Sequence, residues 1–445
     1  MPNLVCFHTH VGMLKLVVPF FFISPDSLTA KRVDFNISMN TVSVSSAWPL
    51  ELLETKTYDR RLTMLAFSRA DFDGAAFLGW KAAQYQKGPL MNVVAAYYVQ
   101  AVRHISMDLP IVFANYRHPR GPLPLPSVTV RFEEPMRSDE FYSYYEDGKS
   151  GSKHCYVDFA NKKLGGGVFG HGMVQEEQMF FQMPELLTIT KAERGHFGSG
   201  WTLHPKGGVL RMANIFVTAF WGREDYELCR TNPVQCADVV KKNGVHSDGP
   251  FDIFAVDAPS FANRPDTRYN SDDFDYFAKK LFILFTAARQ AECDILHSGP
   301  LGAGAFRGSA QLGATLQSVF AEALGVRLRY HGPDLHFTAL RELAALPDDL
   351  KSRQLHSLPA VIDFLRASSW GHGTAASQYE LHARGKGVPL AIRDHGSHSK
   401  HRHGKVHRIL RLPDFARKHG KAEPPAIMDA LPEAKHARRK WWKMK

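Results

Sequence analysis

The central part of the chain alternates between short apolar runs and amphipathic stretches. We expect Ser271 to cap one amphipathic helix, and we expect a second helix to run from about Ser309 to Leu324, with Gly325 as its stop signal. This alternation predicts an α/β fold in which helices cover both faces of a central mixed sheet. The apolar runs of strand length are residues 153–160, 213–220, 252–258, 293–298 and 326–332.

The preceding part of the chain has a different pattern. Residues 49–110 favour helices, with Val94 and Tyr98 among the apolar positions that recur at helical spacing. Prolines and a glycine then predict a connector, and an alternating run from Ser127 predicts a strand. We expect residues 1–48 to be an N-terminal segment, 49–126 an accessory helical region, 127–380 an α/β domain with a helical extension, and 381–445 a flexible basic tail.

The N-terminal segment contains an apolar stretch, residues 11–23. Lys15 and Pro19 interrupt it, and it is shorter than the ~20 apolar residues that a membrane span needs. It also lacks the flanking basic region and cleavage site of a signal peptide. We therefore expect no membrane association, and a mitochondrial targeting segment or a start at Met39 remains open.

The composition is that of an ordinary globular protein. Of 445 residues, 44% are hydrophobic and 22% are charged, which excludes a wholly disordered or collagen-like chain. The cysteines are odd in number and scattered, and no two form a CxxC motif, so we expect neither a disulfide framework nor a zinc ribbon. A reducing compartment, the nucleus or the cytoplasm, fits this pattern. The five cysteines are Cys6, Cys155, Cys229, Cys236 and Cys293.

The positive charge is confined to the C-terminal tail. Residues 381–445 hold 17 Lys and Arg against 5 Asp and Glu, so the tail carries +12 and the rest of the chain −1. Blocks of like charge are typical of solvated segments that contact polyanions such as nucleic acid nonspecifically. The histidines between His395 and His407 lack a cysteine or carboxylate pattern that would complete a metal site, so we expect no metal.

Candidate chemistry begins with a glycine triplet. Gly165, Gly166 and Gly167 follow the predicted strand at residues 153–160. Consecutive glycines suit a place where backbone N–H groups approach a ligand closely, as in phosphate-binding loops.

Two adjacent acidic residues follow this triplet. Gln175, Glu176 and Glu177 open an amphipathic helix. The helix dipole alone favours acidic residues in a first turn, so a plain helix start is one interpretation. Beside a phosphate loop, two carboxylates can instead divide the work of glycoside cleavage, because one with a raised pKa protonates the leaving oxygen while the other binds sugar hydroxyls.

A second glycine-rich loop, residues 297–310, lies between a strand and a helix. Gly302 and Gly304 permit close backbone approach, and the helix behind them offers its N-terminal dipole to an anion. Phe306 suits stacking on an aromatic ligand or filling the local core. A dinucleotide-binding fingerprint fits poorly, because the acidic residue after the next strand, Asp334, comes about thirty residues beyond Gly304.

Taken together, these segments resemble the signature of the poly(ADP-ribose) glycohydrolases. VDFANKKLGGGVFGHGMVQEE (residues 157–177) looks like the family's lead-in, glycine triplet and Gln-Glu-Glu, and GPLGAGAFRGSA (299–310) resembles its second diphosphate loop. The similarity covers roughly Ser127 to Asp334. It implies a macrodomain-like fold with an accessory helical domain, which binds terminal ADP-ribose and hydrolyses ribose–ribose O-glycosidic bonds without a metal or cofactor.

The resemblance also implies roles for individual residues. Glu177 corresponds to the catalytic acid and base, and Glu176 to the carboxylate that holds ribose hydroxyls. Asp158 and Asn161 correspond to the lead-in residues of the distal ribose pocket. The other implied substrate-binding residues are Gly165, Gly166, Gly167, Gln175, Gly302, Gly304, Phe306 and, as the nearest candidate for a tyrosine at the adenine end, Tyr226.

The adenine side departs from the family pattern. Pro300 and Leu301 stand where the second loop usually carries Asn and Trp, and Ser309 replaces its closing acidic residue. Either Tyr330 or His331 takes the place of the aromatic expected to stack on adenine. Because the catalytic segment is intact, we expect retained chemistry with altered affinity.

The expected function is that of a monomeric glycosidase acting on poly(ADP-ribose) or ADP-ribosylated proteins. Two alternatives are a hydrolase that removes single ADP-ribose units from proteins and a non-catalytic ADP-ribose reader. Retention of both Glu176 and Glu177 argues against the reader, because a second carboxylate facing an anionic ligand costs affinity through charge repulsion.

Overall fold

The computed structural model describes the greater part of the chain between residues 50 and 370. The N-terminal segment 1–48 and the basic tail 381–445 lie outside the described residues, so what the sequence predicts for them stays a prediction. The described residues are 50–68, 87–117, 121–144, 147, 150–190, 203, 208–219, 222–243, 248–264, 268–349, 355–368 and 370.

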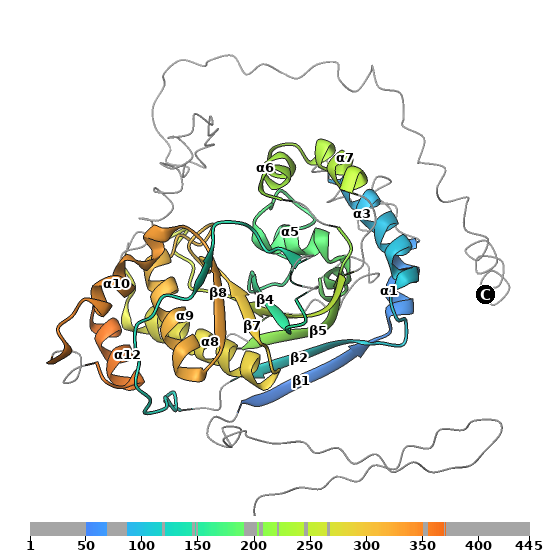
Figure 1. Ribbon diagram of the computed structural model, residues 1–445. Coiled ribbons are helices and arrows are strands. Elements are labelled where there is room, and N and C mark those ends of the chain that lie inside the picture. Colours follow the sequence, from blue (N-terminus) through green and yellow to red (C-terminus); the bar gives the residue numbers. More distant parts are fainter. Residues whose placement is uncertain are drawn as a thin grey trace, which may run out of the picture. The chain divides into compact units, whose positions relative to one another are not determined.

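A mixed eight-stranded sheet forms the centre of the fold. Its strands are β1 (Glu51–Tyr58), β2 (Ile111–Arg117), β3 (Met136–Ser138), β4 (His154–Phe159), β5 (Val209–Val217), β6 (Asp248–Val256), β7 (Ile295–Ser298) and β8 (Arg327–His331). They lie in the order β1-β2-β5-β6-β4-β7-β8-β3 (Figure 1). In this order, the neighbours in β1-β2-β5-β6 pair antiparallel, and the neighbours in β6-β4-β7-β8-β3 pair parallel. The predicted α/β fold with a mixed sheet is confirmed.

Helices cover both faces of this sheet. The α-helices are α1 (Arg60–Ser68), α3 (Gly88–Ala101), α5 (Gln175–Gln182), α6 (Arg223–Thr231), α7 (Pro233–Asn243), α8 (Ser271–Gln290), α9 (Ala310–Leu324), α10 (Thr338–Ala344) and α12 (Leu358–Ala367). Short 3₁₀ turns are η2 (Val102–His104), η3 (Pro184–Ile189) and η4 (Asp334–Phe337). In Figure 1, α8 and α9 lie on one side of the sheet, and α1, α3 and α5 lie on the other.

Successive residues of a central strand serve opposite hydrophobic cores. Tyr156 of β4 packs into the core that contains α3 and α5, whereas its neighbour Val157 packs into the core that contains α8 and α9. Side chains alternate between the two faces of a strand, so a strand buried on both faces is continuously apolar. This explains why the predicted central strands were recognisable as apolar runs.

The ends of the long helices follow local rules. The Ser309 hydroxyl accepts the Leu312 N–H at the start of α9, and Gly325 ends that helix with a left-handed φ of 66°. Both ends were predicted. At α8 the capping residue is Asn270, whose side chain accepts the Asp273 N–H, so Ser271 is the first helical residue and not the cap.

The prediction that residues 49–126 are helical is wrong for β1 and β2. Both strands lie within that region and extend the sheet beyond β5. The side chains of β1 are mostly exposed, because it is an edge strand, so its sequence lacks the alternation of a half-buried strand.

The strand predicted from Ser127 is also wrong. Residues 123–135 contain no regular secondary structure. Val130 and Phe132 are nevertheless buried in the core of α8 and α9. Their apolar spacing therefore reflects burial without strand pairing.

Four of the five cysteines form disulfides, which corrects the expectation from their scatter. Cys155 of β4 bonds to Cys293, which precedes β7, and Cys229 of α6 bonds to Cys236 of α7. The first pair is separated by 138 residues, so only the tertiary fold brings the two thiols together. The expectation of a reducing compartment rested on the scattered positions of the cysteines in the sequence. Because four of them are paired, that pattern no longer supports it.

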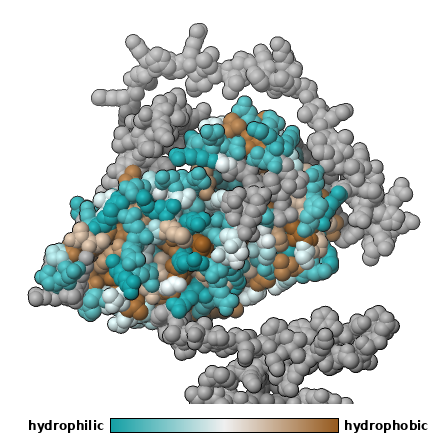
Figure 2. All heavy atoms as spheres, in the orientation of Figure 1, coloured by the Kyte–Doolittle hydropathy of each residue, from teal (hydrophilic) through white to brown (hydrophobic). Residues whose placement is uncertain are grey.

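One face of the molecule can be compared with the hydropathy of its residues. Figure 2 shows one face on which hydrophilic residues predominate and apolar residues are interspersed among them. Among the described residues, no helix combines the length and the apolar character that crossing a membrane requires.

Candidate active site

The candidate site lies at the carboxyl edge of the parallel strands. β4 ends at Phe159, β6 at Val256 and β7 at Ser298. These strands are parallel neighbours, so their ends share one edge of the sheet. Both predicted glycine-rich loops leave from this edge, where open α/β sheets generally bind ligands.

Gln175 joins the first turn of α5 to the end of β4. Its side-chain oxygen accepts the Phe159 N–H at 2.8 Å, and its amide group donates to the Val157 carbonyl at 3.1 Å. The structure therefore places this predicted substrate-binding residue as a brace between strand and helix. The intervening glycine loop, residues 160–174, must fold back over a short span.

Glu177 is buried and holds the second half of the glycine loop. One carboxylate oxygen accepts the Gly167 N–H at 2.6 Å, and the other accepts the Val174 N–H at 2.9 Å. The Val174 contact closes the N-terminus of α5, as the plain helix-start interpretation requires. The Gly167 contact joins Glu177 to the glycine triplet. Glu177 therefore both closes the first turn of α5 and holds the loop.

Glu176 is also buried and holds the first half of the loop. Its two oxygens accept the N–H groups of Asn161 at 2.9 Å and Gly165 at 2.7 Å. Asn161 therefore contributes its backbone to the site, and its exposed side chain accepts the Lys163 N–H at 3.1 Å. The two adjacent glutamates together bind four N–H groups of the same loop.

Close packing around the glycine triplet leaves little space for side chains. A Cβ atom on Gly166 would lie 2.5 Å from a Glu176 oxygen and 2.6 Å from a Glu177 oxygen, and Gly166 has a φ of 45°. A Cβ atom on Gly167 would lie 2.8 Å from the Cα atom of Gly172. The absence of a side chain at Gly166 therefore lets the loop backbone lie close to the two carboxylates. Close approach of this backbone to a ligand stays a prediction.

Asp158 adds a third buried carboxyl group. It is fully buried at the end of β4, and neither oxygen has a hydrogen-bond partner among the described residues. Burial, and then the charge of Glu177, raise the pKa of Asp158 well above its usual range. Burial, and then the charge of Asp158, likewise raise the pKa of Glu176. Carboxyl groups crowded in this way retain protons near neutral pH.

The second loop packs against the ends of β6 and β7. Gly302 has a φ of 76°, and a Cβ atom there would lie 2.5 Å from that of Ala258. Gly304 is exposed and has open space where a Cβ atom would stand. The Phe306 carbonyl accepts the Phe261 N–H at 2.8 Å, and its ring packs against the core of α8 and α9. These contacts support local core filling, while stacking on a ligand stays a prediction.

The aromatic candidates for the adenine end occupy different surroundings. The Tyr226 hydroxyl donates to the Met173 carbonyl at 2.9 Å and thereby ties α6 to the first loop. Tyr330 is fully buried beside Phe337 in the core. His331 is only partly buried, so of the two residues left open by the sequence it is the one with exposed surface.

His154 and His297, on the neighbouring strands β4 and β7, form a buried polar cluster with Asp147. Nitrogen atoms of His154 and His297 lie 2.7 Å apart, and Asp147 oxygens lie 3.4–3.5 Å from these two imidazoles. These residue types at this spacing resemble a metal-binding set. Arg329, however, pairs with Asp147 at 3.2 Å, and a hydrogen bond accounts for the contact between the imidazoles. The ion pair with Arg329 and the hydrogen bond between the imidazoles therefore stabilise this cluster.

Lys87 is a site residue that sequence reasoning missed. It precedes α3 in the accessory region, is 2% exposed, and donates to the Gly167 carbonyl at 3.1 Å. A lysine in front of a helix, without a neighbouring motif, gives no sign that it contacts a loop 80 residues further along the chain.

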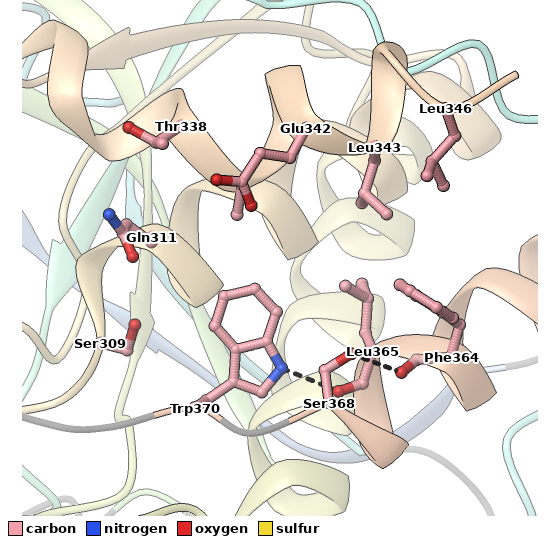
Figure 3. Close-up of a pocket in the computed structure, with 11 residues that line it drawn as sticks. Ser309, Gln311, Thr338, Glu342, Leu343, Leu346, Phe364, Leu365, Ser368 and Trp370 are labelled. Carbon is pink, nitrogen blue, oxygen red and sulfur yellow. Dashed lines mark hydrogen bonds between the residues drawn. The ribbon is translucent and has the colours of Figure 1, made fainter.

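A cavity of about 510 Å³ lies apart from the carboxylates, between α9, α10 and α12 (Figure 3). The Trp370 indole forms one wall and donates its N–H to the Leu365 carbonyl at 2.8 Å. Glu342 and Gln311 supply polar groups on the opposite side. None of the predicted site residues lines this cavity.

The fold and the site together define a macrodomain-like α/β protein with paired acidic groups under a glycine loop. Residues 141–191, which include β4, the loop and α5, match the family model described as poly(ADP-ribose) glycohydrolase, macro domain fold. This match confirms, over that segment, the resemblance seen in the sequence.

The comparison with solved structures finds poly(ADP-ribose) glycohydrolases. The poly(ADP-ribose) glycohydrolase of Thermomonospora curvata, bound to the inhibitor ADP-HPD, is 13% identical over 46% of this chain and 77% of its own, with a TM-score of 0.32. The Deinococcus radiodurans enzyme in complex with ADP-ribose is 13% identical over 51% of this chain and 87% of its own, with a TM-score of 0.32. No curated protein sequence matches the chain.

Proposed function

We propose that this protein hydrolyses poly(ADP-ribose) at ribose–ribose O-glycosidic bonds and releases ADP-ribose, with Glu177 as general acid and base. The observation that carries the proposal is the glycine loop folded around Glu176 and Glu177, within the segment that matches the family model. Glycoside hydrolysis requires a positioned proton donor and a second carboxylate near the sugar, and this pair supplies both.

The reaction needs one proton delivered and one removed. As general acid, Glu177 passes a proton to the glycosidic oxygen as the bond to the anomeric carbon breaks. The resulting carboxylate then takes a proton from the water that adds to that carbon, which restores the acid. The raised pKa values of Asp158 and Glu176 support this step, because they keep protons within the carboxyl cluster at neutral pH.

The polar ends of two helices support an anionic substrate. The first loop leads into α5 and the second into α9, both from the same edge of the sheet. Helix N-termini favour phosphate groups through their unpaired N–H groups and their dipole. A diphosphate placed between the loops would bring the attached ribose towards the carboxyl cluster.

The direct test compares the wild-type protein with Glu177→Gln on purified poly(ADP-ribose), with products resolved by chromatography. We expect free ADP-ribose from the wild type and a rate at least ~100-fold lower from the variant, because an amide cannot exchange the proton. Binding of ADP-ribose, measured by calorimetry, should weaken only several-fold, since one of the two loop contacts of this side chain is retained.

The matched control is Glu224→Gln, an exposed residue of α6, which should leave the rate unchanged. Equal losses of binding and rate in Glu177→Gln would show that this residue binds substrate and is not the acid. Polymer left intact by the wild type, with ADP-ribose released from mono-ADP-ribosylated protein, would favour the single-unit hydrolase. Binding without either reaction would favour the reader.

A further inference from the structure

Lys87 connects the accessory region to the catalytic loop. It occupies the position before α3, and its side chain runs inward until the ammonium group lies 5.5 Å from the centre of the Phe181 ring on α5. Only 2% of the residue is exposed. A buried ammonium group loses its hydration, and this cost must be offset by acceptors and opposite charge nearby.

The acceptors that offset this cost all belong to the first loop. The ammonium group donates to the carbonyls of Gly167 at 3.1 Å and Val168 at 3.4 Å, and also to the carbonyl of Gly172. An ammonium group has three N–H donors, and the three carbonyls use all of them. Lys87 therefore joins the middle of the loop to the part near its end.

The same loop residues contact the proposed catalytic acid. The Gly167 N–H donates to Glu177 at 2.6 Å while its carbonyl accepts from Lys87, so this residue is held from both sides. A Cβ atom on Gly172 would lie 2.5 Å from the same Glu177 oxygen. A displacement of the loop at Lys87 would therefore also displace the partners of the Glu177 carboxylate.

Lys87 also sets the direction of neighbouring N–H groups. In a trans peptide the carbonyl and the N–H of one unit point in opposite directions. The carbonyls of Val168 and Gly172 face Lys87, so the N–H groups of Phe169 and Met173 point away from it. These two N–H groups, turned away from the ammonium group, have the orientation that anion-binding loops use.

We propose that Lys87 is a positioning residue of this enzyme, which fixes the glycine loop so that Glu177 and the loop N–H groups meet the ribose and diphosphate of the substrate. The inference rests on the proposed function. Lys87 acts through the loop and not on the reacting atoms, so it is a positioning and not a catalytic residue.

The protonation state of Lys87 gives this role a signature. Burial lowers its pKa from 10.5 to about 8, while the charge of Glu177 opposes that shift. The other acidic groups of the cluster, Glu176 on α5 and Asp158 on β4, both interact with Glu177. Above pH 8 the neutral amine keeps only two N–H donors and loses its attraction to Glu177, so the loop should loosen and the rate should fall.

This loss of rate should not reflect unfolding. A base whose pKa is lowered by folding binds fewer protons in the folded state than in the unfolded state between about pH 8 and 10.5. Its contribution to the free energy of unfolding therefore rises with pH in that window. As the pH rises through this window, deprotonation of Lys87 should therefore lower the rate of hydrolysis while it raises the free energy of unfolding.

The test combines two variants with an exposed lysine of α7 as control: Lys87→Met, Lys87→Arg and Lys242→Met. For the wild type and Lys242→Met, we expect kcat on poly(ADP-ribose) to decline above pH 8. Lys87→Met should lower kcat by about 100-fold at pH 7, the scale expected for a reacting group misplaced by an ångström. Lys87→Arg should retain more activity and lack the alkaline decline, because a guanidinium group does not titrate there.

A second measurement does not depend on the reaction. Hydrogen exchange of the peptides covering residues 160–174 should be faster by about tenfold or more in Lys87→Met, and unchanged in Lys242→Met, because the loop opens locally once its shared donor is lost. If Lys87→Met does not fold, the pH profile of Lys87→Arg and its loop exchange decide instead.

The outcomes separate this inference from the proposed function. Polymer hydrolysis by the wild type, with rate, pH profile and loop exchange unaltered in both Lys87 variants, would overturn the role of Lys87 and leave the function standing. A wild type that leaves the polymer intact would overturn the function and with it the catalytic part of this role. Loop exchange would then still show whether Lys87 holds the loop.

Discussion

At the scale of single residues, the two oxygens of Glu177 have different partners. One closes the first turn of α5 through Val174, and the other holds Gly167 of the loop. Glu176 uses both oxygens on the loop. The pair therefore fixes the backbone around itself, and the space between loop and carboxylates leaves no room for a side chain at Gly166.

Gly166→Ala tests this residue-scale packing. The new Cβ atom would lie 2.5–2.6 Å from oxygens of Glu176 and Glu177, at a φ of 45° that side chains rarely adopt. We expect the loop to shift and ADP-ribose affinity, measured by calorimetry, to fall about 5- to 150-fold, since a strained residue costs ~1–3 kcal/mol. Gly222→Ala, which has open space around it, should bind normally. Equal affinities in both variants would refute the assignment of this loop to the ligand.

At the scale of elements, a buried ion pair joins the accessory helices to the site. Arg60 at the start of α1 pairs with Glu185 of η3 at 2.5 Å, and neither side chain is exposed. Glu185 also accepts the Tyr98 hydroxyl of α3 at 3.1 Å and the Phe216 N–H of β5 at 3.1 Å. Since η3 follows α5 directly, this cluster fixes the far end of α5.

Glu185→Gln should therefore destabilise the fold strongly. Removing one partner leaves the Arg60 charge buried and unpaired, which costs about 3–5 kcal/mol of unfolding free energy. Arg61→Met offers a matched control, because Arg61 pairs with Asp108 at the surface with 59% and 85% of the side chains exposed, and such pairs are worth ~0–1 kcal/mol. Urea denaturation of both variants measures this difference, and the midpoint should be much lower for Glu185→Gln than for Arg61→Met. Similar midpoints would contradict the structural role of the Arg60–Glu185 pair.

Which elements could be predicted depended on whether their signals were local. The helices α8 and α9 carry amphipathic spacing over several turns, and α9 has its cap and stop within its own sequence. β4 and β6 are apolar because both faces are buried. β1 gave no such signal, because an edge strand is specified by pairing with β2 and not by its own alternation.

At the scale of the whole molecule, two disulfides join parts that the chain keeps apart. Cys155 and Cys293 connect β4 to the residues before β7, across 138 positions. In the chain-entropy account, closing a loop of this length adds about 5 kcal/mol to the free energy of unfolding. Cys229 and Cys236 join α6 to α7, and α6 carries the Tyr226 contact with the first loop.

A thiol count tests this pairing. Protein purified without reductant and then denatured should present one reactive thiol out of its five cysteines, because two pairs are bonded. Treatment with dithiothreitol should expose all five and lower the Tm. Five thiols before reduction would contradict the disulfides and restore the case for a reducing compartment.

The sequence by itself determined the fold class, the two loops and the acidic pair. These depend on periodicity and on residues within about twenty positions of one another, a range in which local backbone rules operate. The tertiary structure decided the burial of Asp158, Glu176 and Glu177, the contact of Lys87 with the loop, and the pairing of the cysteines. Such contacts join distant segments, and a partner contributed by a distant segment leaves no trace in the local pattern of either one.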